Sequence, residues 1–176
     1  DDEELAGLGG ALDAAPYGRP PVAPVVYIKP GTCVAPAGSA IIMPPAAETL
    51  VLAPTLALLI RRDISKGEAE PLDALGAACL VIDVREPCDS YYRPAIRQSC
   101  RDSFLPMAAW TAFEPAFLGA TITTEMDGDR AHRWSLDRLT RSVPNLISSL
   151  TEFMTLRSGD ILLVGLPGDA PSGIKG

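Results

Sequence analysis

The residues best suited to chemistry are concentrated in one stretch of the chain, from Leu80 to Pro106. An apolar run over residues 77–82 ends at Asp83, and a segment rich in tyrosine, arginine and aspartate follows directly. This pattern is typical of a buried strand that delivers polar groups to a cavity. Guanidinium groups bind carboxylates through paired hydrogen bonds, and phenols add directed ones, so the stretch predicts a pocket for a small molecule with several carboxylates. The groups that would line it are Tyr91, Tyr92, Arg93, Arg97 and Arg101.

A simpler interpretation of the same arginines stays open. Arg93, Arg97 and Arg101 are spaced at i, i+4 and i+8, which is also the spacing of one exposed helix face. On such a face they would pair with nearby acids at the surface and contribute little to binding or stability.

Metal-ligating and triad-type residues are sparse. A carboxylate at the end of an apolar strand costs free energy unless it is paired, so Asp83 is the one metal-ligand candidate we retain. His132 is the only histidine, and it lies in a predicted hairpin strand beside Arg130 and Arg133. We therefore interpret it as a surface or strand-pairing residue, which argues against a Ser-His-Asp relay.

Composition narrows the classes of function. The chain has 176 residues, 47% of them hydrophobic, which is enough for one core, so we expect a single domain over 25–176 after a flexible arm at 1–24. The net charge of -7 disfavours nucleic acid or an anionic membrane as a partner. Four cysteines without CxxC spacing, an acidic start without signal-peptide character and no apolar run long enough to span a membrane lead us to expect a cytoplasmic protein.

The periodicity predicts many short strands and few helices. Strands are expected at 25–28, 40–43, 50–60, 77–82 and 161–164, and alternation into Asp127-Gly128 predicts a hairpin of 121–126 with 130–134. Helices are expected at 68–78, from Ser135, and from Pro144 with its apolar face reaching Met154, while 110–117 is expected to be a loop. Together these elements predict a β-dominated α+β fold.

Several short segments, taken in order, resemble the fumarylacetoacetate hydrolase family. They are the Lys29-Pro30 turn, LALLI at 56–60, LGA at 75–77, Asp83, DSFLP at 102–106, EMDG at 125–128 and LRSGDILLVGLP at 156–167. The run SYYRPAIRQSCRDSF further resembles one branch, the amino-terminal-type subunit of the isomerase/decarboxylase of homoprotocatechuate (4-hydroxyphenylacetate) breakdown. The resemblance implies a mixed β-roll or sandwich, and either a homodimer or a heteromer with a paralogous subunit.

The same resemblance implies a metal-dependent reaction. The family holds Mg²⁺ or Mn²⁺ with two glutamates of an ExE pair and an aspartate, and the ion stabilises the enolate of a 2-oxo acid. In this branch the implied reaction is decarboxylation of 5-oxopent-3-ene-1,2,5-tricarboxylate, with isomerisation of the product by a companion domain. Here Ala53 and Thr55 stand at the glutamate positions and leave Asp83 alone, so we expect metal binding to be weak or absent.

Two functional hypotheses follow. In the first, the chain is a decarboxylase or isomerase of a small carboxylated 2-oxo acid. Its catalytic residues would be Lys29, Tyr91, Tyr92 and Arg101, and its substrate-binding residues Arg93, Arg97 and Asp102. In the second, the chain is a catalytically silent structural partner of an active paralogue, because it has lost the glutamate pair.

Overall fold

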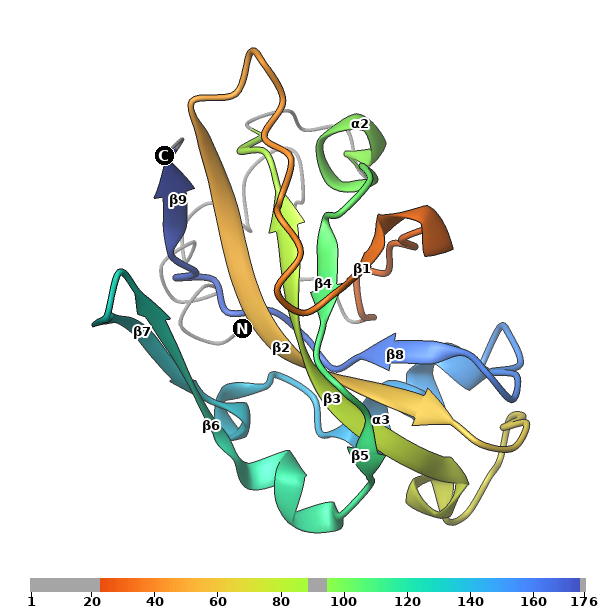
Figure 1. Cartoon of the computed structure of the whole chain (residues 1–176). Helices are drawn as coiled ribbons and strands as arrows, with labels where there is room; N and C mark the ends of the chain where they lie inside the picture. Colours follow the sequence, from red (N-terminus) through yellow and green to blue (C-terminus); the bar gives the residue numbers. More distant parts are fainter. Residues whose placement is uncertain (1–22, 89–94, 175–176) are drawn as a thin grey trace, which may run out of the picture.

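Two long strands form the centre of the fold. The computed structural model describes residues 23–88 and 95–174, and in it β2 (Thr49–Ile60) pairs antiparallel with β3 (Leu75–Arg85) along nearly their whole length. Figure 1 shows both strands bending as they cross the molecule. Their register places Ala53 opposite Asp83 and Thr55 opposite Val81. Because directly paired residues point to the same face of a sheet, Ala53, Thr55 and Asp83 share one face.

Shorter strands complete a seven-stranded mixed sheet. Its order is β1-β4-β3-β2-β8, with β5 added to β3 and β9 added to β2. β1 runs parallel to β4 and the other pairs are antiparallel. This mixed, β-dominated architecture confirms the predicted fold class. The bounds are β1 Val34–Pro36, β4 Leu105–Met107, β5 Thr111–Ala112, β8 Ile161–Leu163 and β9 Ser172–Ile174.

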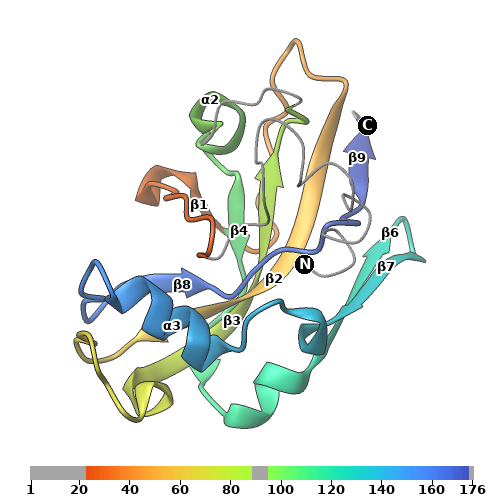
Figure 2. The same cartoon turned by 180° about the vertical axis from the view of Figure 1, so that it is seen from behind.

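One α-helix covers the lower part of the long strands. α3 (Val143–Thr151) begins after Ser142, whose side chain accepts a hydrogen bond from the Asn145 backbone N–H, as an N-cap does. Ile147 and Leu150 of this helix join the largest core cluster, together with Leu56 and Leu58 of β2. Figure 2 shows α3 lying against the sheet beside β8. The other helical segments are short: η1 (Gly31–Cys33), η2 (Pro71–Ala74), α2 (Ile96–Ser99), η3 (Pro115–Gly119) and η4 (Leu136–Arg138).

The predicted hairpin is confirmed as a separate two-stranded sheet, β6 (Thr121–Met126) with β7 (Asp129–Ser135). Asp127 and Gly128 both have positive φ, 53° and 87°, as the tight turn between right-twisted strands requires. The hairpin is fastened to β2 by Trp134, whose Nε1 donates to the Pro54 carbonyl at 3.0 Å. Pro54 lies between the segments of β2 that pair with β8 and with β9, where its missing N–H leaves no ladder bond unmade.

Several predicted elements are wrong in type or extent. Residues 25–28 and 40–43 form no strand, and their contacts include Tyr27 with Asp83 and the Ile42 N–H with the Ser103 hydroxyl. The helix expected at 68–78 is reduced to η2, because the chain from Leu75 onward belongs to β3. The expected loop at 110–117 contains β5 and the start of η3. α3 ends at Thr151, which leaves Phe153 69% exposed rather than on its buried face.

The described helices place no membrane span in the chain: none of them combines the length and apolar character that crossing a bilayer requires.

A buried thiol on β3 predicts a specific loss of stability in alkali. Burial raises the pKa of Cys79 from 9.0 to about 11. Above pH 9 the thiol of the unfolded chain ionises while the folded one keeps its proton, so the unfolded state binds fewer protons and stability falls as pH rises toward 11. We expect Cys79→Ala to flatten this part of the stability curve. Chemical unfolding at pH 8, 9, 10 and 11 measures it, and equal slopes in both proteins would contradict the assignment.

Candidate functional site

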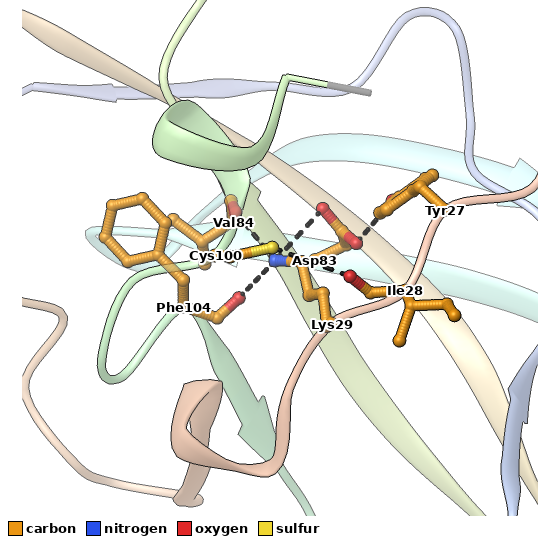
Figure 3. A network of polar contacts seen from close by, with 7 residues as sticks. All are labelled: Tyr27, Ile28, Lys29, Asp83, Val84, Cys100 and Phe104. Carbon is orange, nitrogen blue, oxygen red and sulfur yellow. Dashed lines mark hydrogen bonds and ion pairs between the residues drawn. The ribbon is translucent and has the colours of Figure 1, made fainter. Parts of the chain in front are cut away.

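A buried polar cluster surrounds Asp83, the carboxylate that the sequence pattern indicated. Asp83 is 0% exposed, and Tyr27 and Lys29 reach it from the extended segment before η1 (Figure 3). The segment can deliver both side chains because residues two apart in an extended chain point the same way. Val26 and Ile28, between and beside them, are 44% and 75% exposed, so they point outward.

Lys29 is the cation of this cluster. Its Nζ donates to the backbone carbonyls of Val84 and Phe104, each at 2.8 Å, and lies 3.4 Å from Oδ1 of Asp83. Burial lowers the pKa of Lys29, and the negative charge of Asp83 opposes that shift. The ammonium thus donates to two backbone carbonyls and pairs with the Asp83 carboxylate, so protein groups satisfy it.

Tyr27 supplies the second contact to Asp83. Its hydroxyl donates to Oδ2 at 2.6 Å, and burial, reinforced by the charge of Asp83, raises the pKa of Tyr27 well above its usual range. No described residue gives Oδ1 of Asp83 a hydrogen bond, and the Lys29 ammonium 3.4 Å away compensates its charge. The cluster is therefore an internally neutralised ion pair with one phenol attached.

The neighbouring residues do not fit a divalent metal ion. Ala53, opposite Asp83, offers only a methyl group, and Thr55, on the same face, donates its hydroxyl to the Gly165 carbonyl. Mg²⁺ and Mn²⁺ require several oxygen ligands, usually including more than one carboxylate. Across residues 23–88 and 95–174 no group of three His, Cys, Asp or Glu side chains could hold a metal ion. The metal-ligand role considered for Asp83 is accordingly not supported by the residues around it.

The predicted arginine cluster is only partly described. Arg97, on α2, is exposed, as is Asp102. Arg101 pairs with Glu86, its Nε and Nη2 lying 2.7 and 2.6 Å from Oε1 of that carboxylate. The guanidinium of Arg101 therefore has a protein carboxylate as partner. Tyr91, Tyr92 and Arg93 lie outside the described residues. The catalytic and substrate-binding roles of all these residues stay predictions.

Sequence reasoning found Lys29 and Asp83 but missed Tyr27. The alternation of Val26, Tyr27, Ile28 and Lys29 was a usable signal, because it places the phenol and the ammonium on one side of the segment. The carbonyls that hold Lys29 belong to Val84 and Phe104, and backbone acceptors leave no trace in a sequence pattern.

His132 is a strand-pairing residue, as predicted. It lies opposite Thr124 in the hairpin, and its Nε2 is 3.1 Å from Oδ1 of Asp169 in the segment after β8. Burial opposes ionisation of Asp169, but the hydrogen bond with His132, a backbone hydrogen bond and the charge of Arg138 together lower the pKa of that carboxyl. This contact ties the hairpin to the 164–171 segment.

Comparison with known proteins agrees with this architecture. The family model described as fumarylacetoacetate (FAA) hydrolase C-terminal matches residues 3–174. The 4-hydroxyphenylacetate degradation bifunctional isomerase/decarboxylase of Salmonella dublin is 35% identical over 158 residues, which are 89% of this chain and 36% of that protein. The chain thus spans about a third of the length of the first curated relatives it matches.

Solved structures share the fold. A 5-carboxymethyl-2-hydroxymuconate delta-isomerase from Mycobacterium smegmatis matches with a TM-score of 0.76 and 23% identity, over 86% of this chain and 62% of that one. A fumarylpyruvate hydrolase from Pseudomonas aeruginosa, solved with Mn²⁺ and pyruvate, matches with a TM-score of 0.72 and 21% identity, over 85% of this chain and 69% of that one. The backbone of the chain therefore follows the fold of such proteins, although its residues around Asp83 do not suit Mn²⁺.

Proposed function

Because this chain belongs to the fumarylacetoacetate hydrolase family, we propose that it is a catalytically silent partner domain of an isomerase/decarboxylase of 4-hydroxyphenylacetate breakdown. The observation that carries the proposal is the self-contained state of Asp83, whose charge is balanced by Lys29 and whose neighbours Ala53 and Thr55 bring no further carboxylate. Reactions that pass through an enolate need preorganised positive charge exposed to the substrate. The Lys29 side chain is 4% exposed, and its ammonium already contacts two carbonyls and Asp83.

The relatives support a role inside a larger assembly. The chain covers only about a third of the isomerase/decarboxylases that it is similar to, which leaves room in those proteins for at least one further domain. We propose that this chain pairs with a family member that retains the glutamate pair, as a heteromer or within one polypeptide, in the cytoplasm. Its contribution would be to complete and stabilise the assembly, while the partner binds the metal and the substrate.

A second candidate keeps catalysis on this chain. It would decarboxylate or isomerise a small carboxylated 2-oxo acid such as 5-oxopent-3-ene-1,2,5-tricarboxylate. It is favoured by the 35% identity to isomerase/decarboxylases and by a cationic group, Lys29, beside Asp83. In this version Arg97 binds a substrate carboxylate, Asp102 contacts a hydrogen-bond donor of the substrate, and Arg101 exchanges Glu86 for the substrate.

One experiment separates the two candidates. The purified chain is assayed for consumption of 5-oxopent-3-ene-1,2,5-tricarboxylate, first alone and then mixed with a family member from the same organism that retains both glutamates. The silent-partner proposal expects no turnover alone, and a complex by analytical ultracentrifugation with higher activity or a higher melting temperature than the active member by itself. Turnover by the chain alone that is abolished in Arg101→Ala would establish the second candidate. If the chain shows no turnover and also forms no complex, both candidates are overturned.

A further inference from the structure

Two cysteine thiols lie beside the Lys29 cluster and have no part in the proposed function. Cys33 ends η1 and is 0% exposed, while Cys100 follows α2 directly and is partly exposed. The Sγ of Cys100 donates to the Ile28 carbonyl at 3.5 Å, which places it next to Lys29 (Figure 3). Both side chains pack into the same apolar cluster, on the face of the sheet that carries Cys79 and Val81.

The two thiols share one apolar cluster and lie in the electrostatic field of the same ammonium. Cys100 packs against the cluster that contains Cys33 and raises the pKa of the Cys33 thiol, and the charge of Lys29 interacts with both thiols. Burial raises the pKa of Cys33, and Lys29 opposes that shift by favouring a thiolate. Cys100 is the member of the pair that solvent can reach, so an oxidant in solution meets it first.

We propose that Cys33 and Cys100 form a site of oxidative modification, at which hydrogen peroxide converts the two neighbouring thiols into an intramolecular disulfide. The Cys100 thiolate attacks the peroxide oxygen, the O–O bond breaks, and hydroxide leaves to become water with the proton lost by the thiol. Cys100 is then a sulfenic acid. The Cys33 sulfur attacks that sulfur, the S–O bond breaks, and the second oxygen leaves as water. Two thiols are oxidised by two electrons, and one peroxide is reduced to two waters.

The other two cysteines differ from this pair in exposure and surroundings. Cys79 is 3% exposed, and burial keeps its thiol protonated by raising its pKa to about 11. Cys88 is partly exposed, which makes it a control for simple accessibility. A bond between Cys33 and Cys100 would connect η1 to the end of α2 and close a long loop, which restricts the unfolded chain. Oxidation would therefore fasten the segment that carries Tyr27 and Lys29, and raise the melting temperature.

The test uses the whole chain and hydrogen peroxide as the probe. We expect intact-mass analysis under denaturing conditions to show a loss of about 2 Da, with a Cys33–Cys100 cross-linked peptide that dithiothreitol removes. Cys88→Ser should form the disulfide as the wild type does. Cys33→Ser should stop at a sulfenic acid on Cys100, which dimedone traps. The proposal would be overturned by any of three results: four free thiols after treatment, a dimedone adduct on Cys88 alone, or a cross-link only between two chains. The wild-type result is decisive even if a serine variant fails to fold.

Discussion

Replacing Lys29 with methionine is expected to lower the free energy of unfolding by about 3–5 kcal/mol, because it removes one partner of a buried ion pair. Of its contacts with described residues the Asp83 carboxylate would keep the Tyr27 hydrogen bond, and the Val84 and Phe104 carbonyls would lose the donor that both share. Each of these groups is costly to leave unpaired in the interior. Urea unfolding at pH 7, followed by far-ultraviolet circular dichroism, measures the difference.

A matched control is available at the surface. Lys66 also pairs with a carboxylate, that of Glu152 at 2.7 Å, but both side chains are largely exposed, 68% and 58%. Solvent screens such a pair, so Lys66→Met should change stability little. If Lys29→Met lowered the free energy of unfolding no more than Lys66→Met does, the buried Lys29–Asp83 pair would not have the stabilising role assigned to it. Restoring neutrality with Lys29→Met plus Asp83→Leu should recover part of the loss, since an apolar replacement of a buried pair is often tolerated.

Trp134→Ala is expected to destabilise the chain by about 3–5 kcal/mol, the usual range for removing a large aromatic side chain from a core. Trp134 is 2% exposed, belongs to the main core cluster, and its indole N–H holds the Pro54 carbonyl at 3.0 Å. Its loss would leave a cavity between the hairpin and β2. It would also leave the Pro54 carbonyl without its partner, in the part of β2 between the segments that pair with β8 and β9.

The other tryptophan provides the comparison. Trp110 is 40% exposed, so Trp110→Ala removes much less buried surface and should cost far less by the same denaturant titration. Trp134→Phe, which keeps most of the volume and loses the N–H, should lie between wild type and Trp134→Ala. Equal effects of Trp110→Ala and Trp134→Ala would contradict the assigned role of Trp134 in fastening the hairpin.

The sequence predicted those elements whose signals are local. The β6–β7 hairpin follows from alternating residues that meet Asp127-Gly128, and β3 follows from an unbroken apolar run. The segment at 25–28 has the same β-branched composition but finds no neighbour for a ladder, so composition alone gave the wrong element. The short helical turn at Pro71 is part of a longer helix predicted over Glu68–Ala78. The local helix signals of that segment do not show that the chain from Leu75 onward pairs with β2.

The candidate site shows the same division. Asp83 was identifiable because a carboxylate in an apolar strand needs a partner, and Ala53 and Thr55 were identifiable as substitutions through the family resemblance. The identity of the partners was not predictable, because Lys29 and Tyr27 lie more than fifty positions away and only the tertiary fold brings them to Asp83. The same holds for Arg101, whose pairing with Glu86 depends on how the chain returns after α2.

Titration of the purified chain with Mn²⁺, followed by electron paramagnetic resonance of the free ion, tests most directly the claim that the Asp83 site has no place for a divalent cation. A lone, internally paired carboxylate predicts no saturable binding at micromolar Mn²⁺ and no rise in melting temperature when Mg²⁺ or Mn²⁺ is added. Binding of one Mn²⁺ per chain at micromolar concentration, abolished by Asp83→Asn, would contradict it and return the metal centre to this domain.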